Sequence, residues 1–188
     1  MKNDLIIDHI NKKLLRTELE TDPWVHKFIE GIFPYDDYQE ILKNLPSKEF
    51  YKSRVSIDKK AKQTNYNPER YVFQIKQDNL KTLNSDQERF WHSLITSLCS
   101  VEIFHTVMKI FKEILDYRMN NLSQIEKEKL GIKNYKIVKK AEIVKDFKKY
   151  HLGAHTDNFN KFITFLFYFP KDKSIENLGT AIYKKKID

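Results

Sequence analysis

Apolar positions in the N-terminal part of the chain follow the period of α-helices. Leucines and isoleucines at positions 5, 6, 10, 14 and 15 predict an amphipathic helix over residues 5–19 that ends before Pro23. A second, short helix is predicted over residues 36–46, where Asp36 or Asp37 can cap the start and Pro46 ends it.

The longest helical pattern begins at Ser85. Ser85 and Glu88 have the spacing of a capping box, in which each side chain satisfies a free amide at the helix start. Apolar residues behind them keep the helical period as far as about Arg118, which predicts one long core helix over residues 85–118. His92 and His105 lie far apart on this helix, so we interpret them as boundary residues and not as metal ligands.

Runs rich in β-branched and aromatic residues predict strands. One strand is predicted over residues 24–33, and residues 70–75 form either a strand or an ordered loop. Four further short runs follow, at residues 135–146, 148–157, 161–170 and 179–183. The predicted helices come first along the chain and the predicted antiparallel strands second. This order predicts an α+β fold, with helices packed on one side of a sheet or half-barrel. The 188 residues fit a single domain, whose residues 1–120 are mainly a helical layer.

The amino-acid composition favours a globular protein over a membrane protein or a nucleic-acid-binding protein. The chain is 40% apolar and 13% aromatic, which is enough to build a core, and its formal charge of +8 comes mostly from lysines scattered among acids. That scatter favours a solvated surface over a nucleic-acid interface. The lone Cys99 allows no disulfide and predicts a reducing compartment, and no stretch has the length of a membrane span. We therefore expect a cytoplasmic protein that does not enter a membrane.

Residues 155–157 read His-Thr-Asp and are the candidate for chemistry. Alternate side chains of an extended strand face the same way, so His155 and Asp157 point to one side and can converge on a metal ion. Non-haem Fe(II) oxygenases use such a pair together with a second histidine. On its own the triplet is weak, because a surface histidine beside a turn-capping aspartate is a commoner explanation.

The sequence around the triplet carries more information. In KDFKKYHLGAHTDNFNKFITFLFYFPKDKSIENLGTAIY, a tyrosine precedes the triplet, and a lysine and an apolar run ending in proline follow it before a Leu-Gly-Thr segment. This stretch resembles 2-oxoglutarate/Fe(II)-dependent oxygenases of the prolyl-hydroxylase-like kind. The N-terminal PWVHKFIEGIFPYDDYQEILKNLP and the helical ERFWHSLITSLCSVEIFHTVMKIF also resemble parts of this family.

The resemblance implies a double-stranded β-helix, the jelly-roll type of barrel, behind an N-terminal helical layer, with residues 135–188 as the first barrel strands. His155 and Asp157 would be iron ligands, and Tyr150, Thr164 and Tyr168 would be candidates for lining the 2-oxoglutarate pocket, with ordinary barrel packing as an equal alternative. The implied activity is hydroxylation of a C–H bond in a small molecule or a protein side chain.

Part of the family's site has no counterpart here. The family adds a second histidine and then an Arg or Lys that holds 2-oxoglutarate, whereas this sequence has no histidine after His155 and no arginine after Arg118. His151 is separated from His155 by about 13 Å of extended chain, too far to share one ion.

Three explanations for the missing part stay open. The chain is part of a longer protein, or a partner chain completes the barrel, or this is a degenerate relative without the chemistry. We favour the first, because a half-barrel exposes sheet edges and apolar surface. The alternative function is a non-catalytic binding or assembly protein that pairs exposed strands with a partner. A polyanion-binding module is the least favoured reading, because no arginines cluster.

Overall fold

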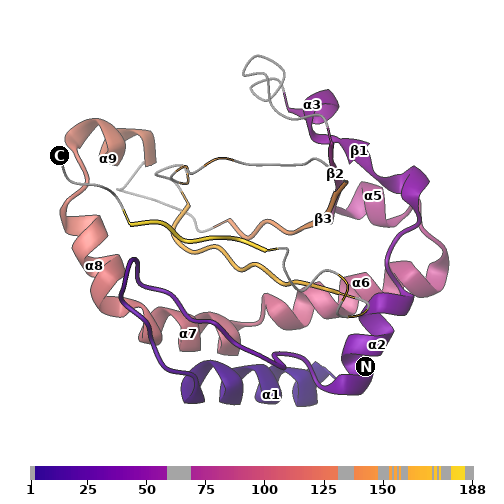
Figure 1. Cartoon of the computed structure of the whole chain (residues 1–188), viewed down its shortest axis with the longest axis horizontal. Helices are drawn as coiled ribbons and strands as arrows, with labels where there is room; N and C mark the ends of the chain where they lie inside the picture. The colour runs from indigo at the N-terminus through magenta and orange to yellow at the C-terminus, as the bar shows by residue number, and fades with distance from the viewer. Residues whose placement is uncertain are drawn as a thin grey trace.

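The computed structural model describes residues 3–58, 69–130, 138–147, 161–170 and 179–184, together with the single residues 153, 155, 157, 172 and 174. Helices and a small antiparallel sheet make up the fold, which confirms the α+β class. Figure 1 shows α1, α6 and α7 along one side of the molecule, the sheet towards one end, and extended chain across the middle.

The described secondary structure, in chain order, is as follows. The helices are α1 (Asn3–Arg16), α2 (Tyr35–Lys43), the 3-10 helix η1 (Lys48–Phe50), α3 (Arg54–Ile57), α5 (Gln77–Leu80), α6 (Ser85–Leu98), α7 (Val101–Ile110), α8 (Lys112–Asn120) and α9 (Gln124–Leu130). The strands are β1 (Lys52–Ser53), β2 (Arg70–Gln74) and β3 (Glu142–Asp146).

The helical layer is built on the buried face of α1, which confirms the predicted N-terminal helix. Ile6, Ile10 and Leu14 are at most 3% exposed and lie on the side that packs against α6 and α7. Leu5 and Leu15 lie on the opposite side of the helix and are exposed. The predicted second helix is also confirmed, as α2, and its Ile41 is fully buried in the same core. The predicted caps were wrong, because Pro34 precedes the helix and Asp36 and Asp37 lie in its first turn.

The single long helix predicted over residues 85–118 is instead three helices, α6, α7 and α8. Asn84, not the predicted Ser85 and Glu88, caps α6, because its side-chain oxygen accepts hydrogen bonds from the two amides of Asp86 and Gln87. Ser100 starts α7 by accepting a hydrogen bond from the amide of Ile103 at 3.3 Å. Serine and asparagine compete for backbone partners in this way, so the helix restarts although the apolar period continues.

The sheet has the order β1-β2-β3, with both pairs antiparallel and with Val72 opposite Lys52 on one side and Val144 on the other. Phe73 and Ile143 are buried in the core. On the other face, Arg70 donates two hydrogen bonds to Asp146, of 2.7 and 2.6 Å, and Arg54 of α3 pairs with Glu142 at 2.5 Å. Two bidentate arginines therefore hold the edge strand β3 in place.

The strand predicted over residues 24–33 is wrong. Its only ladder contact is an isolated bridge between Glu20 and His26, and the rest is loop. α1 holds this loop through the Nε2 of His9, 3.1 Å from the Gly31 carbonyl. Of the three aromatic residues in this run, Phe33 is buried in the core, where it contacts the rings of Phe167 and Phe169, whereas Trp24 and Phe28 are exposed.

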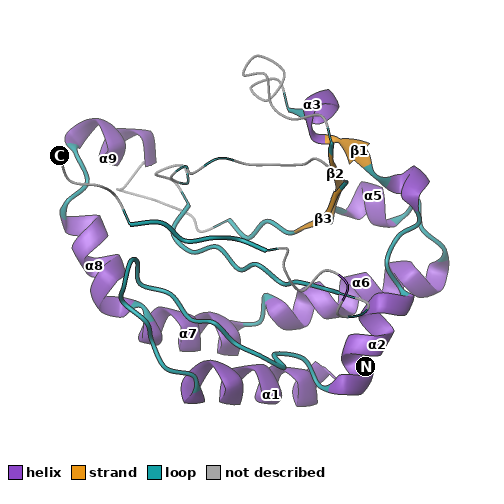
Figure 2. Ribbon diagram, viewed as in Figure 1, coloured by secondary structure: helices purple, strands orange, loops and turns teal. Residues whose placement is uncertain are grey.

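Of the four C-terminal runs predicted as strands, the first contains β3, and the described parts of the other three are extended chain without a strand ladder. Figure 2 shows the described residues 161–170 and 179–184 as loop that crosses the middle of the molecule. Residues 161–170 and 179–184 are described as loop, residues 148–152 lie outside the described part, and only residues 142–146 of the run 135–146 form a strand. No jelly roll is formed by the described residues.

In the described part of the chain, no single helix has both the length and the apolar character needed to span a membrane. Only α6 and α7 taken together reach that length and composition, and they are bent by 40° where they meet.

Candidate functional site

Asp157 lies at the centre of the candidate site, and both of its carboxylate oxygens are engaged. The Nζ of Lys161 donates to Oδ1 at 2.7 Å, and the hydroxyl of Thr164 donates to Oδ2 at 3.0 Å. Both donors come from the start of the extended segment 161–170, four and seven residues further along the chain. One carboxylate is thus held on two sides, by a cation and by a neutral hydroxyl.

These contacts set the charge of Asp157. Partial burial pushes the pKa of the carboxyl up, but the hydrogen bonds from Lys161 and Thr164, with the nearby charges of Lys161 and His155, outweigh it and hold the pKa below its usual value. Asp157 is therefore an anion at neutral pH. An anionic oxygen is what a hard divalent cation requires of a protein ligand.

His155 is oriented by the backbone. Its Nδ1 lies 2.9 Å from the carbonyl oxygen of Gly153. Because a carbonyl only accepts, Nδ1 carries the proton in the neutral ring, and the lone pair is on Nε2. Histidines that bind metals are commonly fixed in this way, with the second ring nitrogen donating to a carbonyl or carboxylate.

Of the other predicted site residues, Thr164 and Tyr168 lie on the segment 161–170, and Tyr150 lies outside the described residues. Thr164 contacts Asp157, whereas the hydroxyl of Tyr168 is hydrogen-bonded to that of Thr180 in the separate segment 179–184. Tyr168 is 52% exposed, and its neighbours Phe167 and Phe169 pack against the core. Thr164 and Tyr168 therefore lie on the face that points away from the helical layer.

Two residues with contacts at the site, Lys161 and Thr180, were recognised in the sequence only as positions in the motif. Neither contact was predicted. The separation of four residues between Asp157 and Lys161 is the signal that was available for the first. The contact of Thr180 joins two segments twelve residues apart, and local spacing carries no signal for it.

The fit of this site to a metal ion is partial. His155 and Asp157 supply a neutral nitrogen and an anionic oxygen, two of the three protein ligands of a facial Fe(II) site. Within the described residues, no three His, Cys, Asp or Glu side chains are close enough to hold a metal together. His9 and His26 contact backbone carbonyls of Gly31 and Trp24.

The remaining candidates in the helices stay outside this site. His92 and His105 are exposed on α6 and α7. Cys99 is half-buried where α6 ends, and burial raises the pKa of its thiol, although the charge of Lys139 acts in the opposite direction. A thiol of this kind is a poor nucleophile, as expected for a structural cysteine.

Contacts with the helices fix the segment that carries Lys161 and Thr164. Arg118 of α8 donates to the carbonyl of Lys161 at 2.7 Å, and its guanidinium lies 5.4 Å from the ring centroid of Phe162. At the far end, the hydroxyl of Tyr38 donates to the carbonyl of Pro170 at 2.5 Å. The segment is therefore anchored to α8 and α2 at its two ends.

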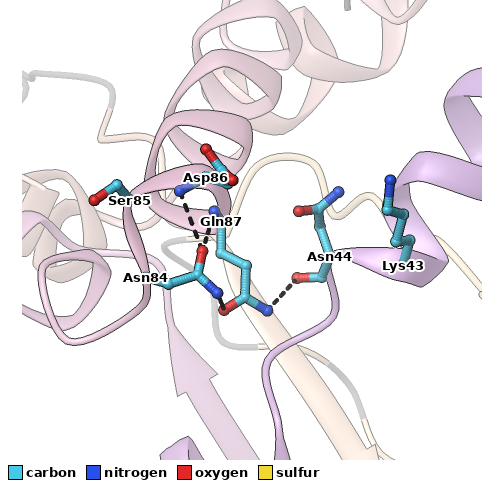
Figure 3. A pocket seen from close by; sticks show the side chains of 6 residues that line it. All are labelled: Lys43, Asn44, Asn84, Ser85, Asp86 and Gln87. Atoms are coloured by element: carbon cyan, nitrogen blue, oxygen red, sulfur yellow. Dashed lines mark hydrogen bonds between the residues drawn. The ribbon is translucent and has the colours of Figure 1, made fainter.

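The surface hollows of the described chain lie elsewhere. One of about 480 Å³ lies between the end of α2 and the start of α6, where Figure 3 shows Asn84 and Gln87 hydrogen-bonded to each other and to backbone. Gln87 also reaches the carbonyl of Asn44, so these groups join the two helices. A second hollow of about 240 Å³ lies beside β1 and β2. Neither is lined by His155 or Asp157.

No protein-family model matches this chain, and neither a curated protein nor a solved structure matches it. The functional interpretation therefore depends on the residues of the site.

Proposed function

We propose that this protein is a non-haem Fe(II)- and 2-oxoglutarate-dependent oxygenase of the hydroxylase type, with His155 and Asp157 as iron ligands. The observation that carries the proposal is the ionised Asp157 carboxylate, two positions from a histidine whose Nδ1 is held by a backbone carbonyl. A facial Fe(II) site uses this pair of residue types, and the Gly153 carbonyl and the Thr164 hydroxyl would orient the two ligands from their outer sides.

The roles of this chain's residues follow from their contacts. His155 would bind the metal through Nε2, the nitrogen not held by the Gly153 carbonyl, and Asp157 would bind it through one carboxylate oxygen while Thr164 holds the other. When bound, iron with 2-oxoglutarate and O₂ would supply the oxidation: 2-oxoglutarate loses CO₂ and takes one oxygen atom of O₂ to become succinate, and the other oxygen atom enters the C–H bond of the substrate. Tyr168, with Tyr150 and Thr164, is proposed to line the cosubstrate pocket.

The barrel belongs to the proposal as well. We take the segments 161–170 and 179–184 as strands of a double-stranded β-helix that are completed by further strands. The third ligand and the Arg or Lys for 2-oxoglutarate come with those strands, either from further chain or from a partner chain. The substrate class is a small molecule or a protein side chain.

Anaerobic addition of Fe(II) and 2-oxoglutarate tests the proposal. Chelation of 2-oxoglutarate by iron gives a weak visible charge-transfer absorption, which we expect in the wild type and not in Asp157→Ala. The matched control is Asp8→Ala, because Asp8 is an exposed acid that also pairs with a lysine four residues on, at 2.6 Å. Equal absorption in the wild type and Asp157→Ala would defeat the assignment.

One observation favours the alternative, a non-catalytic binding or assembly protein. Phe165 and Leu166 are 48% and 58% exposed on extended chain that has no strand neighbour among the described residues. Such chain can accept a strand from a partner. This function predicts that a partner slows amide exchange in residues 162–168 equally in the wild type and in Asp157→Ala, with no iron-dependent absorption in either.

A further inference from the structure

The backbone of residues 162–169 has no hydrogen-bond partner within the described part of the chain. The carbonyls at its two ends are held by the helical layer: that of Lys161 accepts from Arg118 at 2.7 Å, and that of Pro170 accepts from the Tyr38 hydroxyl at 2.5 Å. Between these ends, no amide or carbonyl of the backbone is bonded to another described residue. Extended chain in this state offers its amides and carbonyls to a further strand, as the edge of a sheet does.

The composition of this stretch indicates what kind of strand it pairs with. Residues 162–169 read FITFLFYF and contain no charge, no glycine and no proline, in a chain that is 32% charged and carries a formal +8. Short segments of this composition pair with copies of themselves. A partner drawn to the positive chain would be acidic and would require lysines or arginines at the contact, and residues 162–169 supply none. A second copy of this chain is therefore the better match.

The exposed apolar area is consistent with a weak pair of copies. Phe165, Leu166 and Tyr168 are 48%, 58% and 52% exposed, and Ile182 and Tyr183 on the segment 179–184 are 45% and 60% exposed. Large side chains have about 150–250 Å² of surface each, so these five present roughly 500 Å² per copy and about 1,000 Å² in a pair. An interface of this size is at the lower limit for a specific complex, and we expect a dissociation constant on the order of 10–100 µM.

We propose that two copies of this chain associate through residues 162–168, which pair antiparallel about a two-fold axis at Phe165. In this register Phe165 lies opposite the partner's Phe165, and Leu166 lies opposite the partner's Thr164. Opposite residues are both even or both odd in number, so the side that packs on the helical layer in one copy continues as the same side in the other. The inference goes beyond the proposed function and does not depend on a metal ion at Asp157.

A charge at Leu166 tests the pairing. In this register the two copies of position 166 are diagonal neighbours, about 7–8 Å apart, so Leu166→Lys brings two like charges together and should raise the dissociation constant about tenfold or more. The matched control is Leu15→Lys, because Leu15 of α1 and Leu166 are both 58% exposed and the added charge is the same. We expect Leu15→Lys to associate as the wild type does.

The experiment is sedimentation velocity of the full chain from about 1 to 500 µM, a range that spans the expected dissociation constant. The wild type and Leu15→Lys should pass from monomer to dimer over the same concentrations, while Leu166→Lys stays monomeric tenfold higher. A wild type that is monomeric throughout overturns the proposal, and slow amide exchange at residues 162–168 in that monomer would assign their pairing to the same chain. Equal association of the wild type and Leu166→Lys also overturns it.

A disulfide tests the register. Directly opposite residues of antiparallel strands have Cβ atoms about 4.5–5.5 Å apart, so Phe165→Cys in a Cys99→Ser background should form a disulfide-linked dimer under mild oxidation with diamide. Leu15→Cys in the same background is the control and should form this product at least tenfold more slowly. Equal rates in the two variants would overturn the pairing about Phe165.

Discussion

The helical layer with its sheet differs from the C-terminal extended chain in how its backbone groups are hydrogen-bonded and in how its apolar side chains are buried. In the first region, helices and strands pair their own backbone groups, and residues such as Ile6, Ile41 and Leu94 are at most 1% exposed. In the second region, residues 161–170 pair with no strand among the described residues. Its aromatic rings lie on two faces: one face packs against the core and the other is exposed to solvent.

The two regions are therefore stabilised by different interactions. The helical region is stabilised by burial of its own side chains, which is the main favourable contribution to folding. The extended segment depends on what it touches, through Phe167 and Phe169 on one side and exposed residues on the other. Substitutions at the contact between the two regions, within each region and at the edge of the sheet test whether the regions are stabilised in these different ways.

The largest expected effect is at the contact between the regions. Phe33 is 7% exposed and its ring centroid lies 5.3 Å from that of Phe167. Phe33→Ala should lower the free energy of unfolding by about 3–5 kcal/mol, because it removes a buried ring and leaves a cavity. It should also speed amide exchange at Phe167 and Phe169.

Phe28→Ala is the control for this change, since Phe28 is in the same loop and 67% exposed. Urea denaturation measures the stability, and hydrogen exchange followed by NMR measures the segment. Exchange at Phe167 that is equally fast in both variants would show that Phe33 does not hold the segment.

A pair of leucines sharpens the comparison. Leu94 of α6 is 1% exposed and Leu166 of the extended segment is 58% exposed. Leu94→Ala should cost about 2–5 kcal/mol of unfolding free energy, and Leu166→Ala no more than about 0.5 kcal/mol. The midpoints of urea denaturation give both values. A comparable loss in the two variants would mean that Leu166 is buried in solution, against a partner or a second copy.

The smallest of the three expected effects concerns the edge of the sheet. Glu142 and Arg54 pair at 2.5 Å and are 16% and 17% exposed, so Glu142→Gln should cost about 1–3 kcal/mol by leaving the guanidinium without its anionic partner. Glu40→Gln, at an exposed acid 3.4 Å from Lys43, serves as the control and should change little.

The pH dependence of the same pair is a separate measurement. Burial raises the pKa of Glu142, but hydrogen bonding and the charges of Arg54 and Lys140 outweigh it, so the folded pKa lies below the ordinary 4.5. A carboxyl whose pKa is lower in the folded state than in the unfolded state stabilises the fold at pH values above its unfolded pKa. This stabilisation is lost as the pH falls through the folded pKa. The stability difference between the wild type and Glu142→Gln should therefore shrink below about pH 4.5, as followed by urea denaturation.

Local periodicity was sufficient to predict α1, α2 and the helical character of residues 85–118, but not the ends of these helices, and α3, α5 and α9 were not predicted. The helices around Ile10 and Ile41 were predicted because the apolar stripe that forms them also buries them. The break at Ser100 was missed, since one serine inside a continuing apolar period is a weak signal. Residues 24–33 were predicted as a strand because the run is rich in aromatic and β-branched residues, and a loop that buries one of them, Phe33, can have the same composition as a strand.

The site was predictable only in part. Alternation along extended chain was sufficient to place His155 and Asp157 two positions apart as a candidate pair. The hydrogen bonds from Lys161 and Thr164 depend on how the chain turns after Asp157, and sequence periodicity does not encode that turn. The third metal ligand stays a prediction.

The two tryptophans offer an optical consequence of this architecture. Trp91 is 3% exposed in the helical core, where its indole donates to the carbonyl of Asn44 at 2.8 Å. Trp24 is 52% exposed and donates to the carbonyl of Tyr183, in the C-terminal chain, at 2.8 Å. Each fluorophore reports on a different region. In Trp91→Phe, the emission of Trp24 alone would follow the release and return of residues 179–184 in real time, without any added label.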